Sequence, residues 1–94
     1  MGMESKFIWK NGGLVPFEQA TLHFLTPALH YGAAVFEGIR SYNTPKGPAV
    51  FRLREHVERL FASAYVLGFR DLPWTVDEIC EAHKDTVRAN GFND

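Results

Sequence analysis

The pattern of apolar residues changes partway along this 94-residue chain, and the change limits the folds that it can adopt. Before residue 54, short runs rich in β-branched and aromatic residues are separated by Gly, Pro and Asn turn signals, which is typical of strands. After it, apolar residues recur every three or four positions, as on an amphipathic helix. Strands followed by helices predict an α+β fold, in which a small antiparallel sheet is covered on one face by a helix pair.

Two hairpins are expected in the first half of the chain. Asn11-Gly12 adopts the positive φ angles of a tight turn, so it predicts a hairpin between residues 7–10 and 14–17. The turn signals at residues 44–47 predict a second hairpin, between strands at 33–42 and 48–53. Between the hairpins, Thr26-Pro27 resembles the start of a helical turn that Gly32 would close.

Two helices are expected in the second half. The first spans residues 54–67 and ends at Gly68; its apolar stripe is Val57, Leu60, Phe61, Ala64 and Leu67. The second begins at a capping box formed by Thr75 and Glu78, and ends at Asn90-Gly91.

Composition narrows the classes of function. A net charge of -1 offers no basic surface for nucleic acid, and no apolar run approaches the roughly 20 residues of a membrane span. One cysteine, Cys80, cannot form an internal disulfide, so we expect a reducing compartment, the cytoplasm. The four histidines show no metal-ligand spacing on any one element, so no metal site is expected.

The strand expected at 33–42 has two chemically different faces. One carries Val35, Glu37, Ile39 and Ser41, and the other carries Ala34, Phe36, Gly38, Arg40 and Tyr42. Glycine weakens a strand interior unless a backbone or ligand approaches closely, so Gly38 indicates a pocket wall that Phe36 and Arg40 would share. The alternative is a bulge or bend at Gly38, with Arg40 paired to a surface acid. Glu37 needs a donor partner or solvent.

A polar face of the first helix carries His56, Arg59 and Ser63. It is either an ordinary solvated face or an anion site, because a guanidinium on a rigid helix suits phosphate or carboxylate. Spacing does not choose between the two. No acid is placed to orient His56 towards Ser63, which argues against a hydrolase triad.

Four segments carry a resemblance to a known family. They are residues 28–32 (ALHYG), 35–42 (VFEGIRSY), 46–48 (KGP) and 51–60 (FRLREHVERL). In this order they resemble the N-terminal domain of the branched-chain amino acid aminotransferases, which are class IV, fold type IV pyridoxal-phosphate enzymes. The resemblance runs from about Ile8 to the end of the chain.

The resemblance implies roles for five residues. Arg59 would hold the phosphate of pyridoxal 5'-phosphate. Tyr31 and Phe36 would line the pocket for the branched side chain, and Gly38 and Arg40 would line the same wall. Tyr31 would reach the neighbouring subunit's site, so the implied assembly is a homodimer or a higher homo-oligomer.

The implied reaction is reversible amino transfer between leucine, isoleucine or valine and 2-oxoglutarate. The family's Schiff-base lysine comes from a segment after position 94, and Lys6, Lys10, Lys46 and Lys84 have no matching context. We therefore expect residues 1–94 to be an incomplete N-terminal small domain of a two-domain enzyme, inactive by itself.

Two alternatives stay open. The first is another fold type IV enzyme, either a D-amino acid or amine transaminase or an aminodeoxychorismate lyase. The second is a stand-alone binding domain without catalysis.

Overall fold

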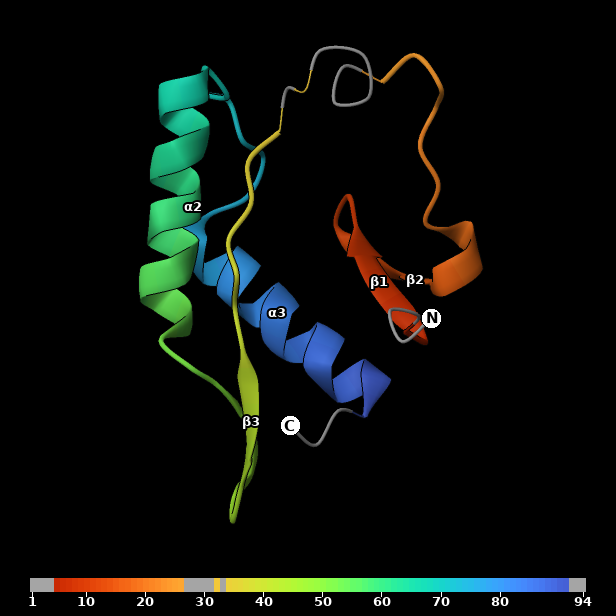
Figure 1. The fold of residues 1–94 in the computed structure, drawn as a ribbon, viewed down its shortest axis with the longest axis vertical. Coiled ribbons are helices and arrows are strands. Elements are labelled where there is room, and N and C mark those ends of the chain that lie inside the picture. Colours follow the sequence, from red (N-terminus) through yellow and green to blue (C-terminus); the bar gives the residue numbers. More distant parts are fainter. Residues whose placement is uncertain (1–4, 27–31, 33, 92–94) are drawn as a thin grey trace.

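The computed structural model describes residues 5–26, 32 and 34–91, and the helical turn expected at 26–32 lies almost wholly outside this part. The described elements are β1 (Phe7–Lys10), β2 (Gly13–Pro16), the 3-10 helix η1 (Phe17–Gln19), β3 (Ser41–Thr44), β4 (Gly47–Val50), α2 (Leu53–Leu67) and α3 (Val76–Asn90). Strands precede the two long helices (Figure 1), so the predicted α+β class is confirmed.

Both predicted hairpins are present, as two separate two-stranded antiparallel sheets. In the first, Ile8 pairs with Val15, and the turn uses positive φ at Asn11 and Gly12, as the Asn-Gly signal predicts. In the second, Tyr42 pairs with Ala49.

The strand expected at 33–42 is shorter in the structure, because β3 begins only at Ser41. The reason lies in its partner. After β4 ends, the Phe51 amide donates to the Arg40 carbonyl at 2.8 Å, and the chain then turns at Arg52, with φ 50°, into α2. The partner strand has therefore left the ladder before it reaches residues 34–39.

The helices match their sequence signals closely. α2 begins at Leu53, one residue before the expected start, and Gly68 ends it with φ 106°. At the start of α3, the Thr75 hydroxyl accepts from the Glu78 amide at 3.1 Å, and the Glu78 carboxylate accepts from the Thr75 amide at 2.9 Å. The predicted capping box is therefore confirmed.

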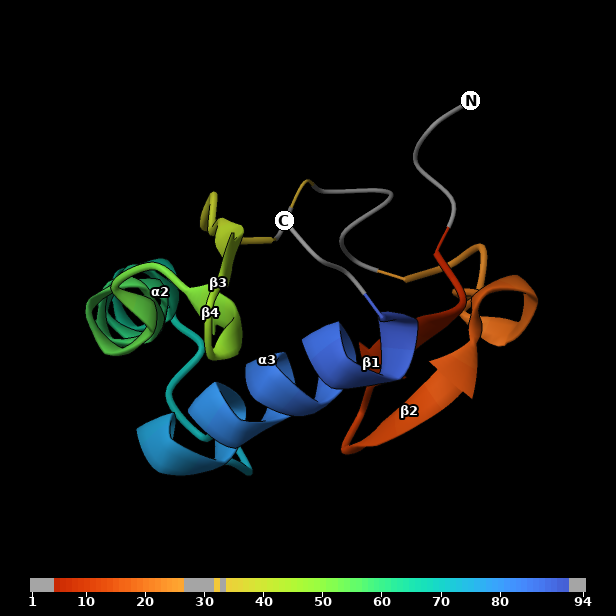
Figure 2. The same cartoon turned by 90° about the horizontal axis from the view of Figure 1, so that it is seen from below.

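The core lies where α2 packs against α3. Leu53, Val57 and Cys80 are buried there, and Val50, Phe61, Val76 and Ile79 pack around them. The two hairpins lie on opposite sides of α3: β3 and β4 extend past the N-terminal end of α2 (Figure 1), whereas β1 and β2 lie across α3 from them (Figure 2).

Asn90 fastens the first hairpin to the end of α3. Its side-chain oxygen accepts from the Lys6 and Phe7 amides at 2.8 and 2.9 Å, and its amide nitrogen donates to the Phe7 carbonyl at 3.0 Å. The buried amide thus pairs with the backbone of β1 much as a neighbouring strand would.

In the described part of the chain, neither long helix has the length and apolar character needed to cross a bilayer.

Candidate functional site

Residues 34–40 run as an extended segment alongside α2 (Figure 1). Odd-numbered residues from 35 to 39, which include Glu37, are partly buried. Even-numbered residues from 34 to 40, which include Phe36 and Gly38, are exposed. The predicted alternation of faces therefore holds although the segment forms no ladder there. It directs Glu37 towards the helix.

Glu37 meets two donors from α2. Arg59 Nε donates to both carboxylate oxygens, at 3.1 and 3.0 Å, and Arg59 Nη2 donates to Oε1 at 2.7 Å. His56 Nδ1 lies 2.7 Å from the same Oε1. The Glu37 side chain is 10% exposed and that of His56 19%, whereas that of Arg59 is 67% exposed.

These contacts fix the charge of Glu37. Hydrogen bonds from Arg59 first, and then from His56, lower the pKa of the Glu37 carboxyl from 4.5 to about 2. The same carboxylate raises the pKa of Arg59. Because an ionised carboxylate only accepts, His56 Nδ1 must carry the hydrogen. Arg59 Nη2, 3.5 Å from that nitrogen, is also a donor and so makes no hydrogen bond to it.

The polar face of α2 therefore does bind an anion, and that anion is the chain's own Glu37. The third polar residue of this face, Ser63, lies further along the helix. It lines a groove of about 440 Å³ with Arg59 and with Ala34, Val35, Ala62, Val66 and Leu67.

The predicted site residues Phe36, Gly38 and Arg40 lie on the exposed face of the segment, turned away from Glu37. Phe36 is 86% exposed, and a Cβ added at Gly38 would meet no atom within 4 Å. The Arg40 guanidinium lies over the Tyr42 ring, 5.4 Å from its centroid. Tyr31 lies outside the described residues. The assignment of these four residues to a substrate wall stays a prediction.

The sequence predicts that Glu37 needs a hydrogen-bond donor or solvent, but it does not identify the donor. Helical spacing places His56 on the polar face of α2 but does not predict its contact with Glu37. The available signal was the cost of burying a carboxylate, combined with the strand parity that turns Glu37 away from Phe36.

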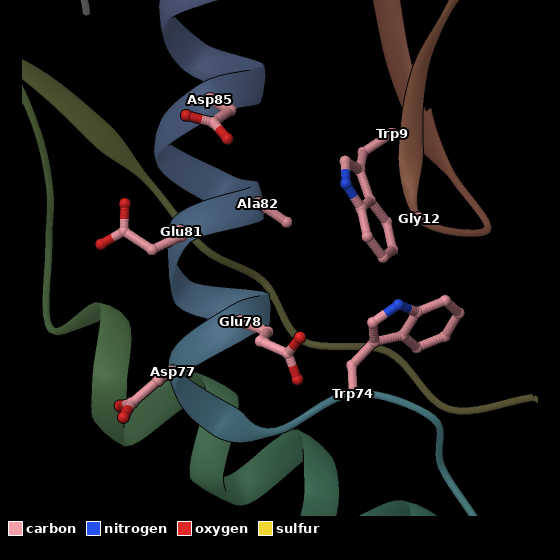
Figure 3. A pocket seen from close by; sticks show the side chains of 8 residues that line it. All are labelled: Trp9, Gly12, Trp74, Asp77, Glu78, Glu81, Ala82 and Asp85. Carbon is pink, nitrogen blue, oxygen red and sulfur yellow. The ribbon is translucent and has the colours of Figure 1, made fainter.

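A second pocket, of about 400 Å³, lies between α3 and the first hairpin (Figure 3). Trp9 and Trp74 meet there edge to face, with ring centroids 5.1 Å apart. Its four carboxylates all have partners within the chain: Asp77 with Arg54, Glu78 with the Thr75 amide, Glu81 with Lys84, and Asp85 with Arg88. None of the predicted site residues lines this pocket.

Among the described residues, no group of three or more His, Cys, Asp or Glu side chains is placed to hold a metal ion.

The sequence and the fold were compared with those of known proteins. No protein-family model matches the chain. The solved structure of a T.th. branched-chain amino acid aminotransferase, complexed with N-(5'-phosphopyridoxyl)-L-glutamate, superposes with a TM-score of 0.90 and 51% identity. The match covers 96% of this chain and 30% of that one. The fold is therefore that of the N-terminal part of a fold type IV aminotransferase.

Curated sequences narrow the class. The branched-chain-amino-acid aminotransferase of Pseudomonas aeruginosa is 51% identical over 85 residues, which is 90% of this chain. That of Escherichia coli K12 is 47% identical over 89 residues, or 95% of this chain. This chain is homologous, over nearly its whole length, to the N-terminal part of the branched-chain aminotransferases, which confirms the resemblance read from the motifs. It spans 27–28% of the length of these two relatives.

Proposed function

We propose that this chain is the N-terminal portion of a pyridoxal-phosphate-dependent aminotransferase. The enzyme would transfer an amino group reversibly between leucine, isoleucine or valine and 2-oxoglutarate. The observation that supports this most is the identity of about half of the residues, over 90–95% of the chain, with branched-chain aminotransferases.

Arg59 would hold the cofactor phosphate. A guanidinium has five N–H donors, and Glu37 takes the edge formed by Nε and Nη2. The other edge, Nη1 and the remaining Nη2 hydrogen, lies on a side chain that is 67% exposed. An exposed, charged fork of this kind suits a phosphate, so the residues present fit the group. When bound, the pyridine ring supplies an electron sink for the amino transfer.

Phe36, Gly38 and Arg40 would form the wall that receives the branched side chain. Their shared exposed face, turned away from Glu37, supports this assignment. Tyr31 would complete the pocket of a neighbouring copy, so the proposed assembly is a homodimer or a higher homo-oligomer. The proposed location is the cytoplasm, in keeping with one free cysteine, Cys80.

The test is to read the gene beyond residue 94 and to assay the encoded protein with a panel of amino donors and 2-oxoglutarate. We expect transamination of L-leucine, L-isoleucine and L-valine that requires added or retained pyridoxal phosphate. Activity on D-alanine without activity on L-leucine would contradict the proposal, and so would a reading frame that ends at Asp94.

A further inference from the structure

The contact between Glu37 and Arg59 divides the guanidinium into two edges. Glu37 accepts from Nε with both oxygens and from Nη2 with Oε1. Nε and Nη2 form one edge of the planar guanidinium, so this edge is saturated by one carboxylate. The adjacent edge, formed by Nη1 and the second N–H of Nη2, is another fork, suited to two oxygens of another anion.

From this geometry we propose that Glu37 is a positioning residue for the cofactor phosphate. It holds the Arg59 side chain in one conformation and leaves the outer fork ready for an oxyanion. This inference rests on the proposed function, because it requires that Arg59 bind the phosphate. The inference adds Glu37, which lies on a different segment from Arg59. Glu37 would set how strongly Arg59 prefers a ligand with a phosphate.

The contact with Glu37 would strengthen phosphate binding because it orders the Arg59 side chain before the ligand arrives. Arg59 is mostly exposed, so without a partner its long side chain would sample many rotamers, and the ligand would have to order it on binding. With Glu37 in place, that ordering has already occurred during folding. The phosphate then meets a fork whose direction is fixed.

Charge repulsion between Glu37 and the phosphate is the opposing effect, and the structure limits it. The carboxylate shares its charge with two donors, Arg59 and His56. It also binds a different edge of the guanidinium from the free fork, although the two edges share Nη2. His56 contributes to the same end, because its Nδ1 holds Glu37 Oε1 at 2.7 Å and so fixes the carboxylate itself.

The experiment compares affinity for pyridoxal 5'-phosphate with affinity for pyridoxal, which lacks the phosphate, in the full protein that its gene encodes. Dissociation constants come from absorbance and fluorescence titration of the apo-protein, so catalysis is not needed. The ratio of the two constants isolates the phosphate contact, because general damage to the fold weakens both ligands alike.

For Glu37→Gln we expect the phosphate preference to fall roughly 3- to 10-fold, the effect of having to order one long side chain on binding. Glu37→Asp keeps the charge and shortens the side chain, so a smaller loss is expected; this variant decides the matter if Glu37→Gln fails to fold. Glu55→Gln is the matched control, since Glu55 lies on the same helix and pairs with Arg52 at the surface.

Arg59→Ala separates this inference from the proposed function. We expect it to reduce the phosphate preference roughly 10- to 100-fold, as for a lost charge-assisted hydrogen bond. Glu37→Gln should then have no further effect in that background. If Arg59→Ala leaves the preference unchanged, the assignment of Arg59 to the phosphate is wrong. If Arg59→Ala lowers it but the Glu37 variants leave it unchanged or raise it, the positioning role alone is overturned.

Discussion

Around Glu37, three side chains balance their charges locally. The carboxylate is negative, the Arg59 guanidinium is positive, and His56 adds a third partner as a donor through Nδ1. Because both donors favour the ionised carboxyl, its pKa falls to about 2. The segment at 34–40 is thereby tied to α2 by a contact that depends on the charge of one residue.

The first prediction concerns acid. A carboxyl whose pKa is lower in the folded protein stabilises the fold above its unfolded value, near pH 4.5, and this contribution disappears as pH falls towards 2. Wild type should therefore be more stable than Glu37→Gln at neutral pH, and the difference should vanish between about pH 4.5 and 2. Urea unfolding at several pH values measures it. The exposed Glu55→Gln should differ little from wild type throughout; a Glu37→Gln difference that persists at pH 2 would contradict the argument.

Strand parity is enough to predict that Glu37 and Phe36 face opposite ways and that Glu37 needs a donor. It does not predict His56 and Arg59 as the donors. Their spacing defines a face of α2 but not the segment that packs against that face. That choice depends on how residues 34–40 are routed along the helix, which is a long-range packing outcome with no local signal.

Among the elements, those whose ends are set by a few neighbouring residues are the most predictable. The capping box of α3 and the Asn-Gly turn of the first hairpin act within a few residues, so local sequence specifies them. The extent of β3 was not predictable in this way. A ladder needs a partner, and β4 turns into α2 before it can pair with residues 34–39.

The α3 cap supplies the second prediction. Thr75→Ala removes the acceptor for the Glu78 amide, and we expect a loss of about 1 kcal/mol in helix stability. Hydrogen exchange measured by mass spectrometry should show faster exchange in the first turn of α3. Thr21→Ala, at an exposed position outside the helices, is the control and should leave that exchange unchanged.

Asn90 supplies the third prediction. Asn90→Ala leaves the Lys6 and Phe7 amides without their acceptor in a partly buried place, for a loss of about 2–3 kcal/mol. Because the contact joins β1 to α3, exchange should increase in β1 as well as at the end of α3. Asn43→Ala, an exposed asparagine in β3, should change neither. An effect confined to α3 would show that Asn90 does not hold the hairpin.

For the whole molecule, the sequence correctly predicts the α+β class and the order of the two hairpins and the two long helices. It does not predict that the strands form two separate sheets on either side of α3, because the pairing of distant strands has no local signal. The outcome matters for function, because the segment that precedes the second hairpin lies alongside α2, where its Glu37 contacts Arg59 (Figure 1). The first hairpin lies away from them, across α3 (Figure 2).

The last prediction follows from where the lysines lie. Covalent attachment of pyridoxal phosphate to one lysine needs an amine beside the aldehyde while the phosphate is held. In the structure the Lys6 amide binds Asn90 at the end of α3, and Lys10 donates to the Thr21 carbonyl. Lys84 pairs with Glu81, and Lys46 lies in the β3–β4 turn. The 94-residue chain, treated with pyridoxal phosphate and borohydride, should therefore show weak labelling spread over its lysines. Peptide mapping measures it, with Arg59→Ala as the control. Full labelling of a single lysine that is lost in Arg59→Ala would mean that these residues contain a complete cofactor site.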